Sequence, residues 1–483
     1  MTVLLFIVGV LIVLIGVGAS IALHEIGHLV PAKLFGVRTP KYMIGFGPTL
    51  WSTRRGETEY GVKAIPLGGY VSMIGMFPPA RGKGDLGRTD FGDLGGTAPD
   101  DAVAGAPATG VDSGRTPTTR RSSTGIFQQL ADDARQASAE ELQPGDEDRL
   151  FYKLPVYKRI IIMLGGPVMN LVIGFVLLAV LVSGVGTYQN TTSVSTVNEC
   201  VLSSAEQAER AAAGEDSCRP EDPLAPASAA GLRPGDRVVE YDGVRLAAWE
   251  WQRLTDLIRS TAGETVEVVY IRDGAEHTAT ITPLLTARPE LDAIGRPVTD
   301  ATGAVQTVEV GFVGMGSETR HMTLPVSEVP EKVGENVRAV ADVVLDLPAR
   351  MAAVARAAFT DAPRDVNGPI SVVGVGRIAG EVSAMEEIPL RDRASTLVGL
   401  VASLNIALFV FNLIPLLPLD GGHVAGALWE AIRRGFAKLF RRRDPGPVDI
   451  ARLLPVTYVV AGLLLVMGVL LIYADIVKPV QLF

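Results

Sequence analysis

The sequence predicts a polytopic α-helical membrane protein of about four transmembrane helices, with a membrane-associated β-hairpin and an inserted extracytoplasmic α+β domain. Apolar residues make up 48% of its 483 residues, and the mean hydropathy is +0.29. Four charge-poor stretches reach the roughly 20 residues that a membrane-spanning helix needs. The first is followed by short strand-like runs, and the second and third are separated by a long polar region.

We expect the four spans at 1–32, 159–187, 394–430 and 453–477. The first could be taken for a signal peptide, because Gly18-Ala19-Ser20 weakly resembles a cleavage site. It lacks a basic n-region and its apolar run is long, so we expect it to be retained.

The distribution of Lys and Arg predicts the orientation. Six basic residues lie within 33–64 and six within 433–443, a stretch inside the predicted loop at 431–452. The positive-inside rule then places both segments in the cytoplasm. We therefore expect a multi-pass protein of the cell membrane whose N-terminus and 190–390 region are extracytoplasmic. The formal net charge of −9 gives no indication of a nucleic-acid partner.

Residues 40–75 are expected to form the membrane-associated β-hairpin. Two apolar, Gly-rich runs, Met43–Trp51 and Tyr60–Met73, flank the polar and turn-like Ser52–Glu59. Such a broken segment cannot cross a membrane as a helix, so at membrane depth it must be covered by protein or line a cavity. The next segment, 79–148, is rich in Gly, Ala, Ser, Thr, Asp and Arg, which predicts a disordered cytoplasmic insertion.

The inserted domain is expected at 190–285. Residues 228–243 include Ala-Gly-Leu-x-Pro-Gly-Asp-x-Val, and a helical pattern follows at Trp249–Ser260. Strand-like runs at Val266–Tyr270 and Thr278–Thr282 flank a turn. The order of these pieces resembles a PDZ domain, and an unrelated small β domain is the alternative.

Cys200 and Cys218 precede the PDZ signature. Outside the cytoplasm they could form a disulfide, whose loop closure would contribute about 3 kcal/mol on the chain-entropy model. Two free thiols are the alternative. Residues 286–392 are expected to be an extracytoplasmic linker and helix, in which Pro348 kinks or divides the apolar pattern of Ala339–Phe359.

The chemistry is predicted by His24-Glu25-Ile26-Gly27-His28, an H-E-x-x-H motif in the first span. Residues i and i+4 share one helical face, so both imidazoles can reach one metal ion. Zinc suits two histidines, a carboxylate and an open water position, and lowers the water's pKa to about 7. Glu25 is placed to take a proton from that water. A coincidental motif is the alternative, but an ionisable cluster in a span is by default a functional hypothesis.

The third ligand must come from elsewhere, because the first Glu after His28 is Glu57. Asp420 is the best candidate. It lies in Asn412–His423, where two prolines interrupt a helix and two glycines permit close approach. The alternative is that Asp420 only caps the next helix. His423 is expected to be structural or to support a ligand rather than to bind the metal itself.

These motifs resemble those of the site-2 protease family, in the bacterial subgroup that cleaves anti-sigma factors. The family pairs H-E-x-x-H with N-x-x-P-x-P-x-L-D-G, here Asn412–Gly421, with Leu417 in place of the second proline and Pro418 after it. The resemblance implies zinc bound by His24, His28 and Asp420. It also implies that Glu25 is the general acid/base and that Asn412 positions substrate or stabilises the transition state.

The resemblance covers nearly the whole chain, apart from the insertion and residues 198–222. Gly45–Pro48 and Pro66–Val71 resemble the family's membrane-dipping hairpin, and Gly165–Asn170 resembles the start of its second core helix. Gly368-Pro369-Ile370 also fits. The family's bacterial prototype has two PDZ modules, and this sequence shows one.

The resemblance implies an intramembrane zinc metalloprotease that cuts single-pass membrane proteins such as anti-sigma factors. A site-1 type protease would make a first extracytoplasmic cut, and membrane lipid would be the other partner. Three alternatives stay open: another membrane zincin with a Glu ligand, a PDZ-bearing scaffold or chaperone, and a zinc transporter. Glu25 argues against a scaffold, which needs no general base, and a single cluster argues against a transport path.

Overall fold

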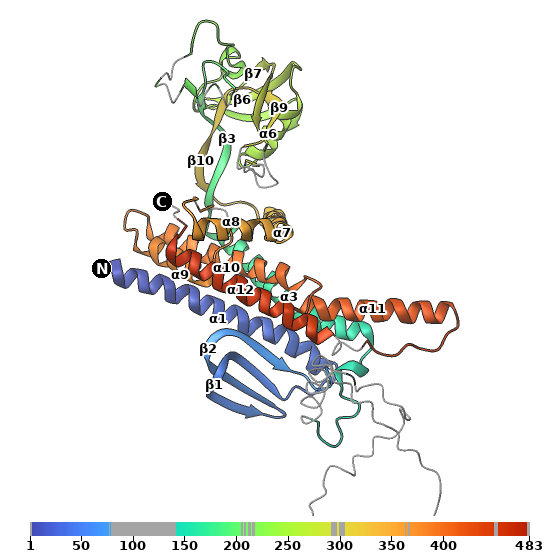
Figure 1. Cartoon of the computed structure of the whole chain (residues 1–483). Helices are drawn as coiled ribbons and strands as arrows, with labels where there is room; N and C mark the ends of the chain where they lie inside the picture. Colours follow the sequence, from blue (N-terminus) through green and yellow to red (C-terminus); the bar gives the residue numbers. More distant parts are fainter. Residues whose placement is uncertain are drawn as a thin grey trace, which may run out of the picture. The chain divides into compact units, whose positions relative to one another are not determined.

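A computed structural model describes residues 2–76, 78, 142–203, 206, 209–210, 214, 218–290, 297–298, 305–362, 364–365, 368–448 and 453–480. Four of the described helices are long and apolar enough to cross a membrane (Figure 1). They are α1 (Thr2–Leu34), α3 (Val156–Ala179) with the π-helical η3 (Val180–Val185), α10 (Leu390–Asn412) and α12 (Leu454–Val477).

The chain divides into two compact units, and these helices contribute to both. The first unit contains Met1–Gly9, Ile173–Leu347 and Ala379–Ile406. The second contains Val10–Val172, Pro348–Ile378 and Ala407–Phe483. All five residues predicted to carry the chemistry therefore lie in the second unit.

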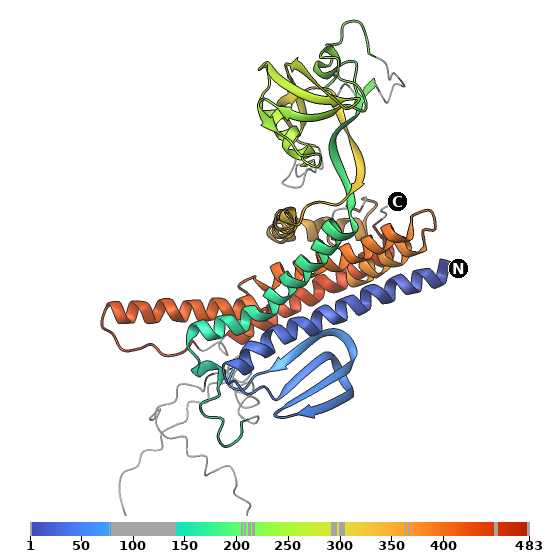
Figure 2. The same cartoon turned by 180° about the vertical axis from the view of Figure 1, so that it is seen from behind.

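In the second unit, β1 (Lys41–Arg55) and β2 (Thr58–Ser72) form a sheet in which each strand is used twice. Lys41–Ile44 pair with Glu59–Val62 on one side and with Gly69–Ser72 on the other. Within the described residues, Gly69–Ser72 therefore form an edge of this sheet. Both views show the sheet beside the C-terminal half of α1 (Figures 1 and 2).

The turn of this hairpin is shorter than the sequence pattern predicted. Strand β1 continues through Ser52–Arg55, and only Gly56 and Glu57 separate it from β2. Ser52–Arg55 are largely exposed at the tip of the hairpin, which is compatible with polar side chains in a strand. Their polarity therefore reflected exposure rather than a turn.

Most of the predicted insertion, residues 79–141, lies outside the described residues. Residues 142–148 are described and form turns. There the buried Asp146 accepts a hydrogen bond from Arg38 Nη1 at 2.5 Å, and Arg149 pairs with Glu57 at 2.8 Å. These contacts tie the end of the insertion to the segments that flank β1 and β2, which composition alone does not indicate.

The third apolar stretch, expected as one span at 394–430, forms two helices. Helix α10 ends at Asn412 and α11 (Asp420–Leu439) begins eight residues later. Pro415 and a cis Leu417–Pro418 bond lie between them, where a continuous helix would lose backbone hydrogen bonds. Because α11 reaches Leu439, the first part of the predicted 431–452 loop is helical.

The first unit contains a six-stranded sheet in the order β10-β3-β4-β6-β7, with β5 paired to β4. Its strands are β3 (Thr187–Val197), β4 (Arg237–Tyr241), β5 (Val244–Arg245), β6 (Val266–Arg272), β7 (Ala275–Ile281) and β10 (Met315–Met322). Helix α6 (Trp251–Ser260) packs on the sheet through the fully buried Leu254, beside Val238 and Tyr241. Strands β3 and β10 continue from the sheet as a paired ribbon (Figure 1).

This domain extends beyond the 190–285 boundary predicted from the sequence. Strands β8 (Leu284–Pro289), β9 (Thr307–Phe312) and β10 occupy the start of the region expected to be a linker. These strands are only six to eight residues long, and such short runs did not stand out from loop sequence. Further along, the helical stretch is divided next to Pro348, as predicted, into α7 (Val329–Leu345) and α8 (Leu347–Phe359). Proline cannot continue a helix from the preceding turn but is accepted in the first turn of a new one, so α8 begins there.

The two cysteines are bonded to each other. Cys200 and Cys218 form a disulfide across a sequence separation of 18 residues. Two free thiols, the alternative left open by the sequence, are therefore not what the structure contains.

Candidate metal centre

Three side chains from α1 and α11 converge on one point. His24 Nε2 and His28 Nε2 lie 3.2 Å apart, and Asp420 Oδ2 lies 3.4 Å and 3.3 Å from them respectively. Zinc bonds to N and O ligands of about 2.0–2.1 Å at tetrahedral angles put two ligand atoms about 3.3 Å apart. The three atoms thus have the spacing of three ligands of one small tetrahedral ion, with a fourth position left for water.

The charges and lone pairs fit a cation as well. Asp420 Oδ2 is buried and accepts no hydrogen bond from any described residue. A buried carboxylate oxygen without a partner is costly, and a bound cation removes that cost. The N-cap of α11 is Leu419, and Asp420 is the first residue of the helix, where a carboxylate is favourable and remains free to face a cation.

Residues of α3 orient the two histidines by contacting their Nδ1 atoms. His28 Nδ1 lies 2.8 Å from the Ile162 carbonyl, so it donates its proton there and leaves the Nε2 lone pair free. His24 Nδ1 lies 3.0 Å from Asn170 Nδ2, while Asn170 Oδ1 is buried without a partner. Because the two ends of an amide are interchangeable by rotation, Oδ1 facing the Nδ1 proton satisfies both groups. Both rings then present Nε2 to the metal.

Glycines let α1 and α3 approach closely enough for these contacts. A Cβ atom added to Gly27 would fall 2.7 Å from the Gly165 carbonyl carbon, and one added to Gly165 would fall 2.7 Å from that of Gly27. The next residue, Gly166, faces the two imidazoles, and a Cβ there would overlap His28 and His24. Small residues at such a crossing allow backbones to touch.

Glu25 lies near the three converging side chains and also contacts the β1–β2 sheet. Only 9% of its surface is exposed, and its carboxylate contacts the backbone N–H of Val71. A Cβ added to Gly69 would fall 2.9 Å from Glu25 Cγ. Glu25 is therefore packed against the Gly69–Ser72 edge of the β1–β2 sheet, which Tyr42 anchors to α1 by donating to the Ala22 carbonyl at 2.8 Å.

Asn412 and His423 are not part of this cluster. Asn412 ends α10, is half-buried, and makes no side-chain hydrogen bond to the three converging residues in the described part of the chain. His423 lies one turn after Asp420 on α11, and its buried Nδ1 has no partner among the described residues. Sequence reasoning noted Gly165–Asn170 as a helix start but did not predict that Gly166 and Asn170 contact the histidines.

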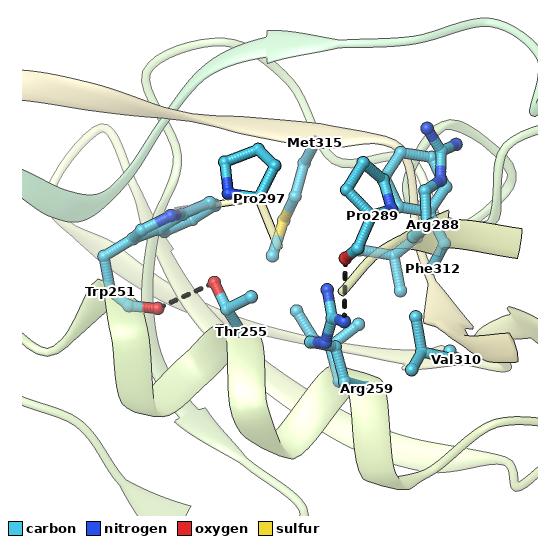
Figure 3. A pocket seen from close by; sticks show the side chains of 12 residues that line it. Trp251, Thr255, Arg259, Arg288, Pro289, Pro297, Val310, Phe312 and Met315 are labelled. Atoms are coloured by element: carbon cyan, nitrogen blue, oxygen red, sulfur yellow. Dashed lines mark hydrogen bonds between the residues drawn. The ribbon is translucent and has the colours of Figure 1, made fainter. Parts of the chain in front are cut away.

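A separate pocket of about 280 Å³ lies in the first unit, between α6 and the β8–β9 strands (Figure 3). Its walls include the apolar side chains of Trp251, Phe312 and Met315. Two guanidinium groups also line it. Arg259 donates to the Pro289 carbonyl at 3.3 Å and Arg288 stacks on Phe312 at 3.5 Å. Within the described residues, neither arginine pairs with a carboxylate.

Comparison with known proteins identifies the family to which the chain belongs. The chain matches the family model for Peptidase family M50 over residues 12–442. It is similar to Zinc metalloprotease Rip1 of Mycobacterium tuberculosis (strain H37Rv), with 31% identity over 99% of this chain and 100% of that protein. It is also similar to Metalloprotease MmpA of Caulobacter vibrioides, at 25% identity over 88% of each chain. Zinc metalloprotease RasP of Bacillus licheniformis is 25% identical over 86% of this chain and 88% of that protein.

Proposed function

The chain belongs to Peptidase family M50 and is a zinc metalloprotease, and from this premise we propose that it hydrolyses peptide bonds of single-pass membrane proteins, within or at the edge of the bilayer. The observation that carries the proposal is the convergence of His24, His28 and Asp420 in a unit built on apolar helices of membrane-spanning length. Anti-sigma factors already shortened outside by another protease are the proposed substrates.

The proposed roles follow from the geometry. His24, His28 and Asp420 would hold zinc, which when bound polarises the scissile carbonyl and acidifies water. Glu25, beside them, accepts a proton from the attacking water and returns it to the leaving amine nitrogen. Asn412 is proposed to position the substrate or to stabilise the transition state, from the end of α10.

The sheet offers a way to present an unwound substrate. A peptide bond within a helix is protected because its carbonyl is already hydrogen-bonded. We propose that the substrate unwinds and adds as a strand to the Gly69–Ser72 edge, where main-chain hydrogen bonds replace those of the helix. Glu25 lies against this edge, so an added strand would run beside the general base.

The domain built on β3–β10 is proposed to be a PDZ domain that lies outside the membrane and screens substrates. It would exclude proteins with large intact outer domains, so that a first cut is required. Its pocket suits a short peptide segment with an apolar side chain and a carboxylate, because Trp251 and Met315 are apolar while Arg259 and Arg288 are cations without acidic partners among the described residues.

Deletion of the proposed PDZ domain can test its screening role without disrupting the paired β3–β10 ribbon. Val197 of β3 lies opposite Met315 of β10, so an Asn-Gly turn can replace residues 198–314 and keep the two strands paired. We expect this variant to cleave uncut substrate that the full chain rejects. Unchanged selectivity would contradict the screening role but not the peptidase activity.

The main test is cleavage of a reconstituted single-pass anti-sigma-type substrate, already shortened outside, by the wild type and by Glu25→Gln. Removing a general base costs about 10²–10⁴-fold in rate, whereas zinc measured in both proteins should be equal. Equal cleavage by both would mean a contaminating protease or a wrong base. Zinc in neither would favour the scaffold alternative.

A further inference from the structure

A buried ion pair links α3 to α11 away from the proposed zinc ligands. Arg159 Nη2 donates to Glu430 Oε1 at 2.5 Å, and the Glu430 side chain is fully buried. Glu430 Oε1 also meets the more exposed Arg434 at 3.1 Å, and Oε2 accepts from the Val448 backbone N–H at 3.0 Å. Both oxygens of this carboxylate are thus engaged, and the pair serves no role in the chemistry proposed above.

On α3, Arg159 lies on the face that orients the histidines. Arg159, Ile162, Gly166 and Asn170 are spaced by three, four and four residues, which places them on one side of a helix. Ile162 accepts from His28, Gly166 faces both rings, and Asn170 contacts His24.

On α11, Glu430 ends the face that begins with Asp420. Between them, Val424 packs into the apolar cluster that contains Ala32 of α1 and Ile162 of α3, and Ala427 is buried. Glu430 follows Asp420 by ten positions of the helix, about 15 Å at the rise of an α-helix. The ligand and the ion pair therefore lie at the two ends of one packed face.

Asp420 is the first residue of α11, so its position depends on the position of that helix. A shift of α11 by one residue would move Asp420 by about 1.5 Å and turn it by about 100°. Metal–ligand distances tolerate only about 0.2 Å. Apolar packing through Val424 and Ala427 is compatible with several registers, whereas an ion pair to a buried Glu430 is satisfied in one.

We propose that the Arg159–Glu430 ion pair is a positioning device, which fixes the register of α11 against α3 and so keeps Asp420 in place as the third zinc ligand. A buried ion pair contributes little net stability compared with apolar residues of the same size, and its best-attested use is to specify register. This inference rests on the proposed function only in taking Asp420 as a ligand.

The test measures zinc affinity of the purified full chain by competition with a chelator, alongside the thermal unfolding of the zinc-free protein. We expect Glu430→Gln and Arg159→Gln to bind zinc about tenfold more weakly, within the range by which contacts remote from a site change binding to it. With Co²⁺ in place of zinc, their visible spectra should also change, because the spectrum reports the coordination of the ion.

Two controls match these variants. Arg434→Gln removes the more exposed guanidinium from the same Glu430 oxygen and should leave zinc affinity unchanged. Asp475→Asn breaks another buried pair of this unit, Arg364–Asp475 at 2.7 Å, which involves α12 rather than the helices that carry ligands. It should lower stability and leave zinc affinity unchanged.

A double variant separates positioning from stability. Arg159→Met with Glu430→Leu replaces the pair by apolar side chains, which should restore stability but not zinc affinity. Wild-type zinc affinity in the double variant, or in both single variants, would overturn the inference. Asp420→Asn identifies a different failure: if it keeps zinc, the proposed ligand set is wrong. If it loses zinc while the ion-pair variants bind normally, only the positioning role is wrong.

Discussion

Replacement of Gly166 by alanine should greatly weaken metal binding without unfolding the protein. The added Cβ would lie 2.7 Å from His24 Cε1 and Nε2, and closer still to His28 Nε2. Ordinary contacts of a Cβ begin at 3.4 Å, so His24 would have to retreat by 3.4 − 2.7 = 0.7 Å, and His28 by more. Because ligand positions tolerate about 0.2 Å, both histidines would leave the metal site.

We expect Gly166→Ala to bind zinc at least about 100-fold more weakly, beyond the usual effect of an outer-shell change, and to lose cleavage in proportion. Alanine is the better helix former by about 0.5–1 kcal/mol, so a loss of zinc would not reflect weaker α3 propensity. Chelator competition measures the affinity, and thermal unfolding of the zinc-free form measures the fold.

The matched control is Gly18→Ala, on the helix that carries the histidines. An added Cβ at Gly18 has no neighbour within 4 Å in the part of the chain that the structure describes, so zinc affinity and cleavage should stay at the wild-type level. If Gly166→Ala binds zinc as tightly as Gly18→Ala, the convergence of His24, His28 and Asp420 does not describe the metal site.

Three further predictions follow from other contacts. Asn170→Ala should weaken zinc binding by about 10–100-fold in the same competition assay, whereas Asn170→Asp, which still accepts from His24 Nδ1–H, should retain most of it; equal losses would exclude the orienting role. The double change of Cys200 and Cys218 to serine should lower the free energy of unfolding of the β3–β10 domain by about 3 kcal/mol in urea with zinc content unchanged, and an unaltered urea midpoint would contradict this. Arg210 holds the pKa of Asp222 at about 2, below its ordinary 3.8, so the stabilisation from this pair is present above pH about 4 and lost as the pH falls through 2. Proteolysis of the 198–222 segment in acid, compared with Asp222→Asn, measures that loss, and identical pH profiles would refute it.

Much of the architecture could be predicted from the sequence because it depends on local patterns. Apolar runs of membrane-spanning length need no tertiary contact to be recognised, and each of the four long apolar helices overlaps one of the four predicted spans, although the third ends at Asn412 rather than near residue 430. Pro348 and the prolines around Leu417 interrupt helices through their own missing N–H groups, so the breaks between α7 and α8 and between α10 and α11 follow directly. Strands β8–β10 were missed because such short runs are identified as strands mainly by the strands they pair with, which lie elsewhere in the chain.

The sequence by itself determined which residues could bind a metal. His24 and His28 share a helical face wherever α1 packs, because they are four residues apart. Asp420 stands out because prolines and glycines surround it. Only the tertiary structure decided that these atoms lie 3.2–3.4 Å apart, because that depends on the backbone contact between Gly27 and Gly165 and on the register of α11. It also decided that Asn170 orients His24 and that Glu430 meets Arg159, 271 residues away in the chain. Such contacts join residues whose local sequences carry no sign of each other, so only the packing of helices could determine them.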